Sequence, residues 1–300
     1  MNNKQQTTNN KQQTTNGMLL ASLASKLHIY NFLLRIGFAG FVHRVINRKL
    51  LKNSRLFFVK NRSRVGSVID MLSDEKSKKV YESAVVYRQT RFFRDRPEKD
   101  ENYQYFPCDI ISVSDREVFI DCGAYIGDTI ADFIKITHNT FLKIVAFEPD
   151  AENYTKLKQI SIQDIRILPF CSGVWNVTGQ LDFYAGTNAG SRVREVENIL
   201  AMDTTPQVIS IPVIAIDTIE ECSDATFIKM DIEGSEMNAL KGAIKTIIKN
   251  RPKLAICIYH SDEDMINIPE YLFSNLENYS FYVRHYSDSI METVFYAVPK

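Results

Sequence analysis

The sequence VFIDCGAYIGDT, residues 118–129, places a short apolar strand directly before a glycine turn and the start of a helix. The apolar run at 118–122 predicts a buried strand, because a strand covered on both faces reads as a continuous hydrophobic stretch. Gly123 and Gly127 then indicate a tight turn in which the backbone can approach a ligand closely. Together these features predict the first unit of an open α/β sheet that binds a cofactor at the strand end.

The side chains of this turn distinguish between two classes of cofactor. A dinucleotide places its pyrophosphate at the helix N-terminus, where free N–H groups and a positive partial charge favour an anion. Asp128 would repel that group, and Tyr125 stands where the nucleotide fingerprint has its middle glycine. S-adenosylmethionine is cationic at its sulfonium and ammonium groups, which Asp121 and Asp128 complement. We therefore predict S-adenosylmethionine and not NAD. The predicted cofactor-binding residues of the turn are Asp121, Gly123, Tyr125, Gly127 and Asp128.

The next two predicted strands add two further cofactor residues. The sequence KIVAFEPD ends its strand at Glu148, about 20 residues after the glycine turn, which is the spacing at which an acid binds ribose hydroxyls. The strand after that leads into Cys171 and Ser172, beside the position expected for an adenine ring. We predict that Glu148 binds the ribose and that Ser172 contributes to the adenine site.

Strands and helices alternate after residue 116, which predicts a mostly parallel sheet with helices on both faces. Two β-rich runs joined by a short polar turn close the chain and predict an antiparallel hairpin. The predicted fold is α/β, the Rossmann-like fold of class I methyltransferases, with a mostly parallel seven-stranded sheet, a C-terminal hairpin and an N-terminal helical extension. The predicted strands are 118–122, 143–147, 166–170, 226–230, 253–259, 280–285 and 292–298.

Acidic residues and a histidine follow two later strands. The sequence KMDIEGSE carries Asp231, Glu233 and Glu236, and LAICIYH ends in His260. Methyl transfer to an alcohol is helped by a base that removes the hydroxyl proton, and an imidazole titrates near neutral pH. We predict His260 as this base, with Asp231 and Glu233 as further catalytic residues. Glu236 is equally explained as the first-turn acid of the following helix.

Two alternatives for this region stay open. Asp231, Glu233 and His260 contain the ligand types that a divalent cation accepts, and such a cation would lower the pKa of a bound hydroxyl. No ligand spacing in the sequence demands a metal, so none is predicted. His285 is a weaker candidate for the base, and Arg284 beside it is a candidate for binding an acidic substrate.

The N-terminal region differs in charge from the rest of the chain. Residues 1–66 contain twelve lysines or arginines and no acid, and because the whole chain is neutral, residues 67–300 carry a net charge of −12. Residues 18–51 are apolar but interrupted by charges, which argues against a membrane-spanning helix and a secretory signal. We expect residues 18–64 to pack on the catalytic domain or on a second subunit, or to contact an anionic membrane peripherally. Nucleic acid is disfavoured as a partner, since the arm lacks a nucleic-acid motif.

Three regions are predicted along the chain. Residues 1–17 hold a tandem repeat of NNKQQTT, a polar stretch that we expect to be disordered. Residues 18–100 form a basic helical extension with a cap helix at 73–91, whose predicted N-cap is Ser73. Residues 101–300 form the catalytic domain. Five scattered cysteines without paired spacing favour a reducing cytoplasm, at the inner face of the membrane if the arm binds lipid.

Taken in order, these motifs resemble the FkbM family of S-adenosylmethionine-dependent methyltransferases. The resemblance covers roughly residues 73–300 and rests on VFIDCGAYIGDT, AFEPD, KMDIEGSEMNALKGA, LAICIYH, FYVRHYS and ETVFYAV. It implies O-methylation of a hydroxyl, with Asp121, Gly123, Gly127 and Glu148 on the cofactor. Bacterial members of the family commonly accompany polysaccharide biosynthesis, so the expected acceptor is a hydroxyl of a saccharide or glycan precursor.

Two other functions compete with this reading. A catalytically inactive protein of the same fold would act as a binding or scaffold protein in glycan assembly, and the intact acids Asp121, Glu148 and Asp231 argue against it. An NAD-dependent oxidoreductase is disfavoured by Asp128 and by the missing middle glycine of the turn.

Overall fold

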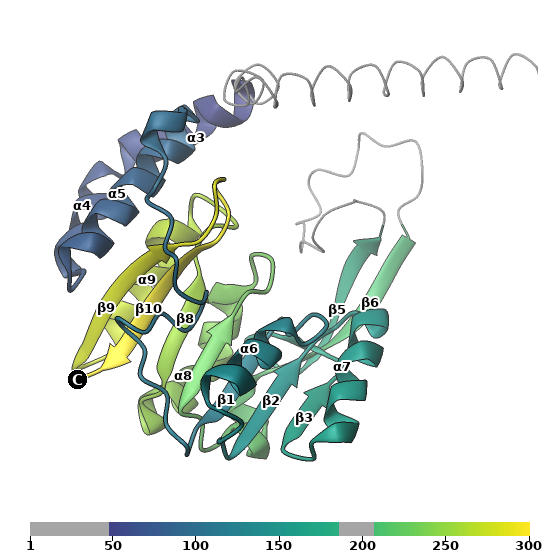
Figure 1. Cartoon of the computed structure of the whole chain (residues 1–300). Helices are drawn as coiled ribbons and strands as arrows, with labels where there is room; N and C mark the ends of the chain where they lie inside the picture. The colour runs from purple at the N-terminus through teal and green to yellow at the C-terminus, as the bar shows by residue number, and fades with distance from the viewer. Residues whose placement is uncertain (1–47, 186–206) are drawn as a thin grey trace, which may run out of the picture.

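The computed structural model describes residues 48–185 and 207–300, which form an α/β fold around one large sheet (Figure 1). The sheet has seven strands in the order β3-β2-β1-β7-β8-β10-β9. All neighbours pair in parallel except β10, which runs antiparallel to β8 and β9. The strands are β1 (Val118–Cys122), β2 (Lys143–Phe147), β3 (Ile167–Phe170), β7 (Phe227–Met230), β8 (Lys253–Cys257), β9 (Tyr279–His285) and β10 (Thr293–Pro299). The predicted fold is confirmed, and every predicted strand ends within two residues of an observed one.

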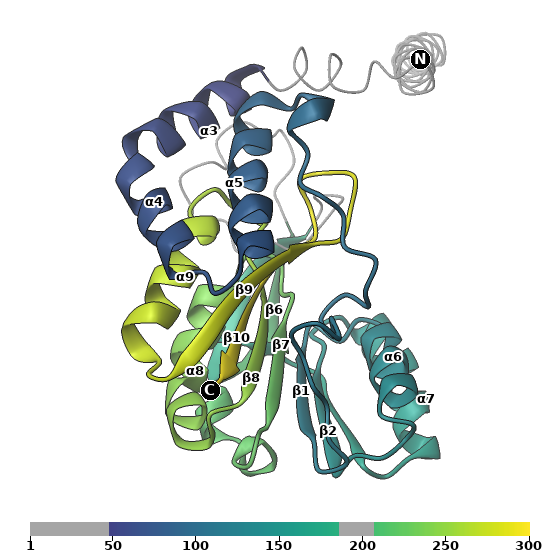
Figure 2. The same ribbon diagram turned by 60° about the vertical axis from the view of Figure 1, so that its left-hand side comes forward.

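Helices cover both faces of this sheet. Neighbouring residues of β1 point to opposite faces, so that Phe119 and Ile120 belong to different apolar cores. The core around Phe119 is closed by α6 and α7, and the core around Ile120 by α8 and α9. The helix bounds are α6 (Asp128–Ile136), α7 (Ala151–Gln163), α8 (Glu236–Asn250) and α9 (Asp264–Asn275). Figure 2 shows the two pairs of helices on opposite sides of the strands. This double cover explains why the strands are apolar at consecutive positions.

A second, three-stranded sheet was not predicted from the sequence. It has the order β4-β6-β5 and lies on the side of the main sheet where β3 is the edge strand (Figure 1). Its strands are β4 (Gly173–Val174), β5 (Gly179–Ala185) and β6 (Gln207–Ile214). The connection between β5 and β6, residues 186–206, lies outside the described residues. Short 3₁₀ helices complete the described elements, namely η1 (Phe93–Asp95), η3 (Ile216–Thr218) and η4 (Glu220–Cys222).

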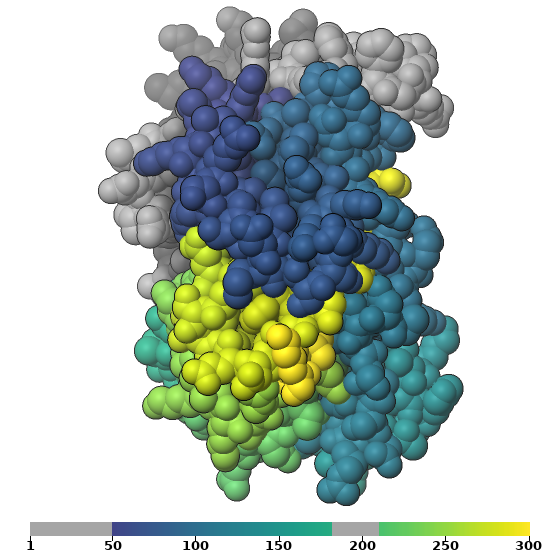
Figure 3. Space-filling view, turned by 90° about the vertical axis from the view of Figure 1, so that its left-hand side faces the viewer, coloured from purple at the N-terminus to yellow at the C-terminus, as the bar shows by residue number. Residues whose placement is uncertain are grey.

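Three N-terminal helices, α3 (Arg48–Lys60), α4 (Arg62–Met71) and α5 (Glu75–Thr90), form a cap over the C-terminal hairpin and α9 (Figure 3). The predicted cap helix is therefore present, but its predicted N-cap is wrong. Asp74 caps α5 by accepting a hydrogen bond from the Ser77 N–H at 2.6 Å. Ser73 pairs instead with β9, since its N–H donates to the Phe281 carbonyl oxygen at 2.8 Å and its Oγ accepts from the Phe281 N–H at 2.9 Å.

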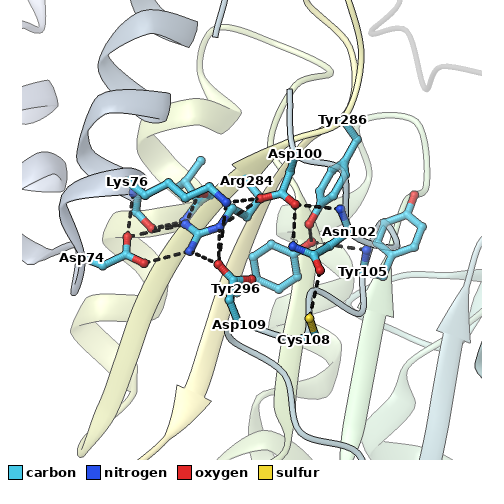
Figure 4. A network of polar contacts seen from close by, with 12 residues as sticks. Asp74, Lys76, Asp100, Asn102, Tyr105, Cys108, Asp109, Arg284, Tyr286 and Tyr296 are labelled. Carbon is cyan, nitrogen blue, oxygen red and sulfur yellow. Dashed lines mark hydrogen bonds and ion pairs between the residues drawn. The ribbon is translucent and has the colours of Figure 1, made fainter. Parts of the chain in front are cut away.

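Arg284 of β9 joins the cap to the segment that precedes β1 (Figure 4). Its side chain is 1% exposed, and its Nη2 lies 2.8 Å from Asp74 Oδ2 and 2.7 Å from Asp109 Oδ2. Its Nη1 donates to Ser77 Oγ at 2.8 Å, and its Nε lies 3.4 Å from Asp100 Oδ2. The alternative that Arg284 binds an acidic substrate is therefore wrong, because the guanidinium is buried and already paired with three carboxylates of the chain.

The N-terminal predictions fall mostly outside the described residues. The polar repeat at 1–17 and the part of the arm up to residue 47 are not among them. In the part of the chain that the structure describes, none of the helices is long and apolar enough to cross a membrane. The described part of the arm is α3 with the start of α4, and Leu50, Leu56 and Val59 of α3 are exposed.

Candidate active site

The carboxyl ends of β1 and β7 meet at one edge of the sheet, where the glycine turn contacts the acidic loop after β7. Gly123 has a φ of +79°, and a Cβ added to it would lie 2.0 Å from the carbonyl oxygen of Asp231. Gly127 has a φ of +88°, and an added Cβ would lie 2.4 Å from Ile160 Cδ1 of α7. The left-handed backbone favours glycine at both positions, and at Gly123 the contact with a backbone oxygen excludes a Cβ as well. The two residues hold the turn against the β7 loop and against α7.

Asp121 lies beneath this turn. Its side chain is fully buried, and its Oδ1 lies 2.9 Å from the Nζ of Lys229, its direct neighbour on β7. The same ammonium donates to the Gly123 carbonyl oxygen at 2.8 Å. Burial lowers the pKa of Lys229, but the charges of Asp121 and Asp231 outweigh burial and raise the pKa above its usual value. Asp121 thus fixes the glycine turn through Lys229, and its contact with a cofactor stays a prediction.

Glu148 connects the glycine turn to the end of β2. Its Oε2 accepts from the Tyr125 N–H and its Oε1 from the Asp150 N–H, each at 2.9 Å. Burial raises the pKa of Glu148, and these two N–H groups oppose that effect only in part. Tyr125 is 52% exposed, and Asp128 is the exposed first residue of α6. The structure therefore brings the predicted cofactor residues Asp121, Gly123, Tyr125, Gly127, Asp128 and Glu148 together at the ends of β1 and β2.

Ser172 lies just after β3, the next strand beyond β2 in the sheet. It is 2% exposed, and its Oγ has no hydrogen-bond partner among the described residues. A buried hydroxyl without a protein partner needs an explanation, and a ligand atom would provide one. The contribution of Ser172 to an adenine site stays a prediction.

Asp231 follows β7 and is held by two tyrosine hydroxyls. Tyr105 Oη donates to its Oδ2 at 2.7 Å, and Tyr259 Oη donates to its Oδ1 at 2.9 Å. Burial alone would raise the pKa of Asp231, but the charges of Lys229 and His260 and the tyrosine hydrogen bonds lower it below its usual value. The side chain remains 22% exposed. Asp231 is therefore an ionised carboxylate that reaches the surface of the site.

His260 follows β8 and lies among the carboxylates of the β7 loop. Its Nε2 is 3.4 Å from Asp231 Oδ1 and 3.7 Å from Glu233 Oε2, and its Nδ1 is 3.1 Å from Glu236 Oε1. Burial lowers the pKa of His260, but the hydrogen bond with Glu236 and the neighbouring carboxylates outweigh it and raise the pKa. The three predicted catalytic residues therefore lie together. The position of Glu236 in the first turn of α8 would by itself explain an acid there, but Glu236 also contacts His260.

His285, the weaker candidate for the base, lies within the C-terminal hairpin. It is 1% exposed, and its Nδ1 is 2.9 Å from Oγ1 of Thr293, its partner on β10. Burial lowers its pKa to about 4. Its position indicates a role in strand pairing.

Three residues that hold the site together were not predicted from the sequence. Lys229 supports the glycine turn, and Tyr105 and Tyr259 fix the Asp231 carboxylate. A signal existed for Lys229, since a lysine inside the apolar run FIKM needs a buried counter-charge. Tyr105 lies in an irregular segment, so no periodic pattern indicates where its side chain points.

The parallel sheet with its terminal hairpin, a glycine turn after β1 and an acid after β2 define a class I methyltransferase fold. The Methyltransferase FkbM domain matches residues 121–283, more than half of the chain. The protein belongs to the FkbM methyltransferase family, as its motifs predicted.

The chain is similar to a solved structure of an FkbM methyltransferase. A methyltransferase FkbM from Methylobacillus flagellatus KT has 27% sequence identity and a TM-score of 0.68, and the match covers 81% of this chain and 60% of that one. The present chain thus spans less than two thirds of that protein.

Two further similarities are much weaker. An rRNA methylase from Streptococcus thermophilus has 13% identity and a TM-score of 0.37, over 63% of this chain and 90% of that one. Fibrillarin from Aeropyrum pernix with natively bound S-adenosyl-L-methionine has 10% identity and a TM-score of 0.39, over 63% and 70%. The comparison with curated proteins finds no match.

Proposed function

We propose that the protein transfers a methyl group from S-adenosylmethionine to a hydroxyl oxygen. The observation that best supports this is the pair of carboxylates, Glu148 and Asp231, directly after the two strands that flank β1 and its glycine turn. An acid on one side suits the ribose hydroxyls of the donor, and an ionised acid on the other suits the positive sulfonium and the acceptor. Membership in the FkbM family supports the same donor.

The residues at the ends of β1 and β2 fit this donor. Gly123 and Gly127 keep side chains out of the turn, and the exposed Asp128 disfavours a pyrophosphate at the start of α6. Glu148 uses one acceptor position on each oxygen for the backbone. A carboxylate offers about four such positions, so Glu148 retains capacity for a ribose hydroxyl.

When bound, S-adenosylmethionine supplies an electrophilic methyl carbon: the acceptor oxygen forms the new C–O bond as the C–S bond breaks, and that electron pair stays on sulfur to give S-adenosylhomocysteine. The hydroxyl proton must leave to a base. Asp231 reaches the surface, and His260 lies 3.4 Å behind it, so we assign the proton to this pair. Glu233, with a side chain 49% exposed, is positioned to accept hydrogen bonds from the acceptor.

For the acceptor we propose a hydroxyl of a saccharide or glycan precursor. The resemblance to bacterial FkbM proteins supports this class, and the exposed acid Glu233 is a group type that binds sugar hydroxyls. The competing proposal, an inactive scaffold protein in glycan assembly, predicts cofactor or glycan binding without turnover on any acceptor.

The test is calorimetric titration of the full chain with S-adenosylmethionine, S-adenosylhomocysteine and NAD in parallel. We expect the first two to bind and NAD not to bind. Glu148→Gln should weaken both by about 10–150-fold, the equivalent of losing one hydrogen bond to a charged group at about 1.5–3 kcal/mol. Glu152→Gln, at an exposed acid of the adjoining helix, is the matched control and should bind normally. Binding of NAD alone, or an unchanged affinity in Glu148→Gln, would contradict the proposal.

We also propose that the protein works in the cytoplasm, with its basic arm at an anionic membrane surface. On α3 the exposed apolar residues Leu50, Leu56 and Val59 alternate with the exposed cations Lys52 and Arg55. Mixed apolar and basic surfaces favour anionic lipid headgroups. We expect the protein to co-sediment with phosphatidylserine vesicles and not to be retained on heparin at the same salt concentration. Retention on heparin alone would favour nucleic acid as the partner.

A further inference from the structure

We propose that Asp231, Glu236 and His260 form a binding site for one divalent cation. One ligand atom from each residue lies within 4.8 Å of the other two. Ligands on opposite sides of a cation are about 4.2 Å apart when each bond is about 2.1 Å long. A small inward movement of these side chains would therefore bring all three atoms within bonding distance of one cation. The sequence suggested Glu233 as the third ligand, and the structure favours Glu236 in that role.

Glu236 provides the observation that points to a ligand. Its side chain is fully buried in the first turn of α8. Its Oε1 accepts from the Ile232 N–H at 2.7 Å and lies 3.1 Å from His260 Nδ1. Its Oε2 is buried and has no hydrogen-bond partner in the part of the chain that the structure describes. Buried carboxylates are normally paired or bound to a metal, so a bound cation would account for the unpaired oxygen.

The charges around Glu236 also favour a cation. Three carboxylates, those of Asp231, Glu233 and Glu236, lie within 3.7 Å of His260. Lys229, the ammonium below them, is already engaged with the acid beneath the glycine turn. The tyrosine hydroxyls and the backbone N–H that contact these carboxylates bring no positive charge. A divalent cation would neutralise the cluster more completely than one imidazole can.

The ligand types and the location of the site limit which cation it would bind and what that cation would do. Two carboxylates and one imidazole suit Mn²⁺ or Zn²⁺ better than Ca²⁺, which takes oxygen ligands. Three protein ligands leave coordination positions for water or an acceptor hydroxyl. Binding of the cation does not depend on the proposed function. The role of the cation does rest on the proposed function, because the bound cation would lower the pKa of the acceptor hydroxyl. Asp231 and His260 would then act as ligands, and the proton of the activated hydroxyl would pass to Glu233, the exposed carboxylate of the cluster outside the ligand set.

The test is titration of the metal-free full chain with Mn²⁺, followed by electron paramagnetic resonance without cofactor or acceptor. We expect one Mn²⁺ per chain. Glu236→Gln and Asp231→Asn should each weaken binding by at least about tenfold, since even outer-shell partners of a metal cost that much. Glu233→Gln is the matched control, because it removes a nearby but solvent-screened carboxylate outside the proposed ligand set, and it should weaken binding less than either ligand variant does.

A measurement on the unmodified protein covers the case in which Glu236→Gln does not fold. Electron spin echo modulation of bound Mn²⁺ should show coupling to one imidazole nitrogen, which His260 supplies. Absence of Mn²⁺ binding at millimolar concentration, absence of the nitrogen coupling, or equal losses in Glu233→Gln and Glu236→Gln would overturn the proposal. Because cofactor titration is a separate readout, S-adenosylmethionine binding without Mn²⁺ binding would refute the cation site and leave the methyl donor standing.

Discussion

Replacing Arg284 with methionine should destabilise the protein by about 3 kcal/mol, because it removes the shared counter-charge of three carboxylates. Loss of one partner of a buried ion pair costs about 3–5 kcal/mol. Asp74 and Asp109 have side chains 34% and 38% exposed, so water can solvate them in the variant. Asp100 is 2% exposed but keeps Lys76 at 2.6 Å. These two features place the expected loss at the lower end of that range.

Urea unfolding followed by circular dichroism measures this loss. Arg64→Met is the matched control, because Arg64 pairs with Glu270 at the surface, where its side chain is 41% exposed. Such a surface pair contributes about 0–1 kcal/mol. A loss in Arg284→Met no larger than in the control would refute the reasoning. In thermal unfolding, Arg284→Met should again be less stable than Arg64→Met, with its midpoint lowered by roughly 6–12 °C.

The effect of Arg284 should also depend on pH. Burial alone would raise the pKa of Asp74, but its hydrogen bonds with Arg284 and Ser77 outweigh burial and lower the pKa. A carboxyl whose pKa is lowered by folding stabilises the protein above its unfolded pKa of about 4, and loses that contribution as the pH falls through the folded value. The gap in stability between the wild type and Arg284→Met should therefore be largest at neutral pH and shrink below about pH 4. A gap that grows on acidification would contradict this assignment.

Three further changes test the interior of the site. Gly123→Ala should cost at least about 2 kcal/mol and weaken cofactor binding, because its Cβ meets the Asp231 carbonyl; an unchanged urea midpoint would contradict the close contact. Lys229→Met should cost about 3–5 kcal/mol by leaving Asp121 buried without a counter-charge, and adding Asp121→Asn should recover part of that loss. Tyr105→Phe should slow methyl transfer by about tenfold, the equivalent of about 1.4 kcal/mol, with normal cofactor affinity by calorimetry; a weakened affinity would place Tyr105 at the cofactor instead.

The sequence predicted the main sheet well because its central strands β1, β2, β7 and β8 are buried on both faces. Such strands are apolar at most consecutive positions, and the glycines and acids at their ends mark where they stop. The small sheet of β4, β5 and β6 gave a weaker signal. β4 has only two residues, and β6 carries Pro212 within its alternating pattern, which lowers the expectation of a strand. The N-cap of α5 was misplaced by one residue, since Ser73 and Asp74 are both good capping residues and β9 pairs with the serine.

The site was predicted only as far as strand ends determine it. Residues that follow the carboxyl ends of parallel strands converge at one edge, so Glu148, Asp231 and His260 could be placed together from the sequence. The buried contacts in the site could not be predicted in this way. The pairing of Asp121 with Lys229 depends on the register of β1 against β7, which sequence periodicity does not fix. The buried ion pair gives Asp121 a role in supporting the turn, whereas the sequence indicated only an acid that complements a cationic ligand.

The site also depends on chain segments that precede the matched family domain. The domain match begins at residue 121, yet Tyr105 donates to Asp231, and Arg88 of α5 donates to the carbonyl oxygen of Tyr259 at 2.9 Å. Arg88 also binds Asp262 at 2.6 Å, and these two contacts hold the loop that carries His260 on both sides. Because the cap and the segment before β1 fix the loops that carry the acid and the imidazole, they are structural parts of the candidate active site. A change in the cap that shifts α5 should therefore alter turnover before it alters cofactor binding, since Glu148 and the glycine turn make their contacts within β1, β2 and β7.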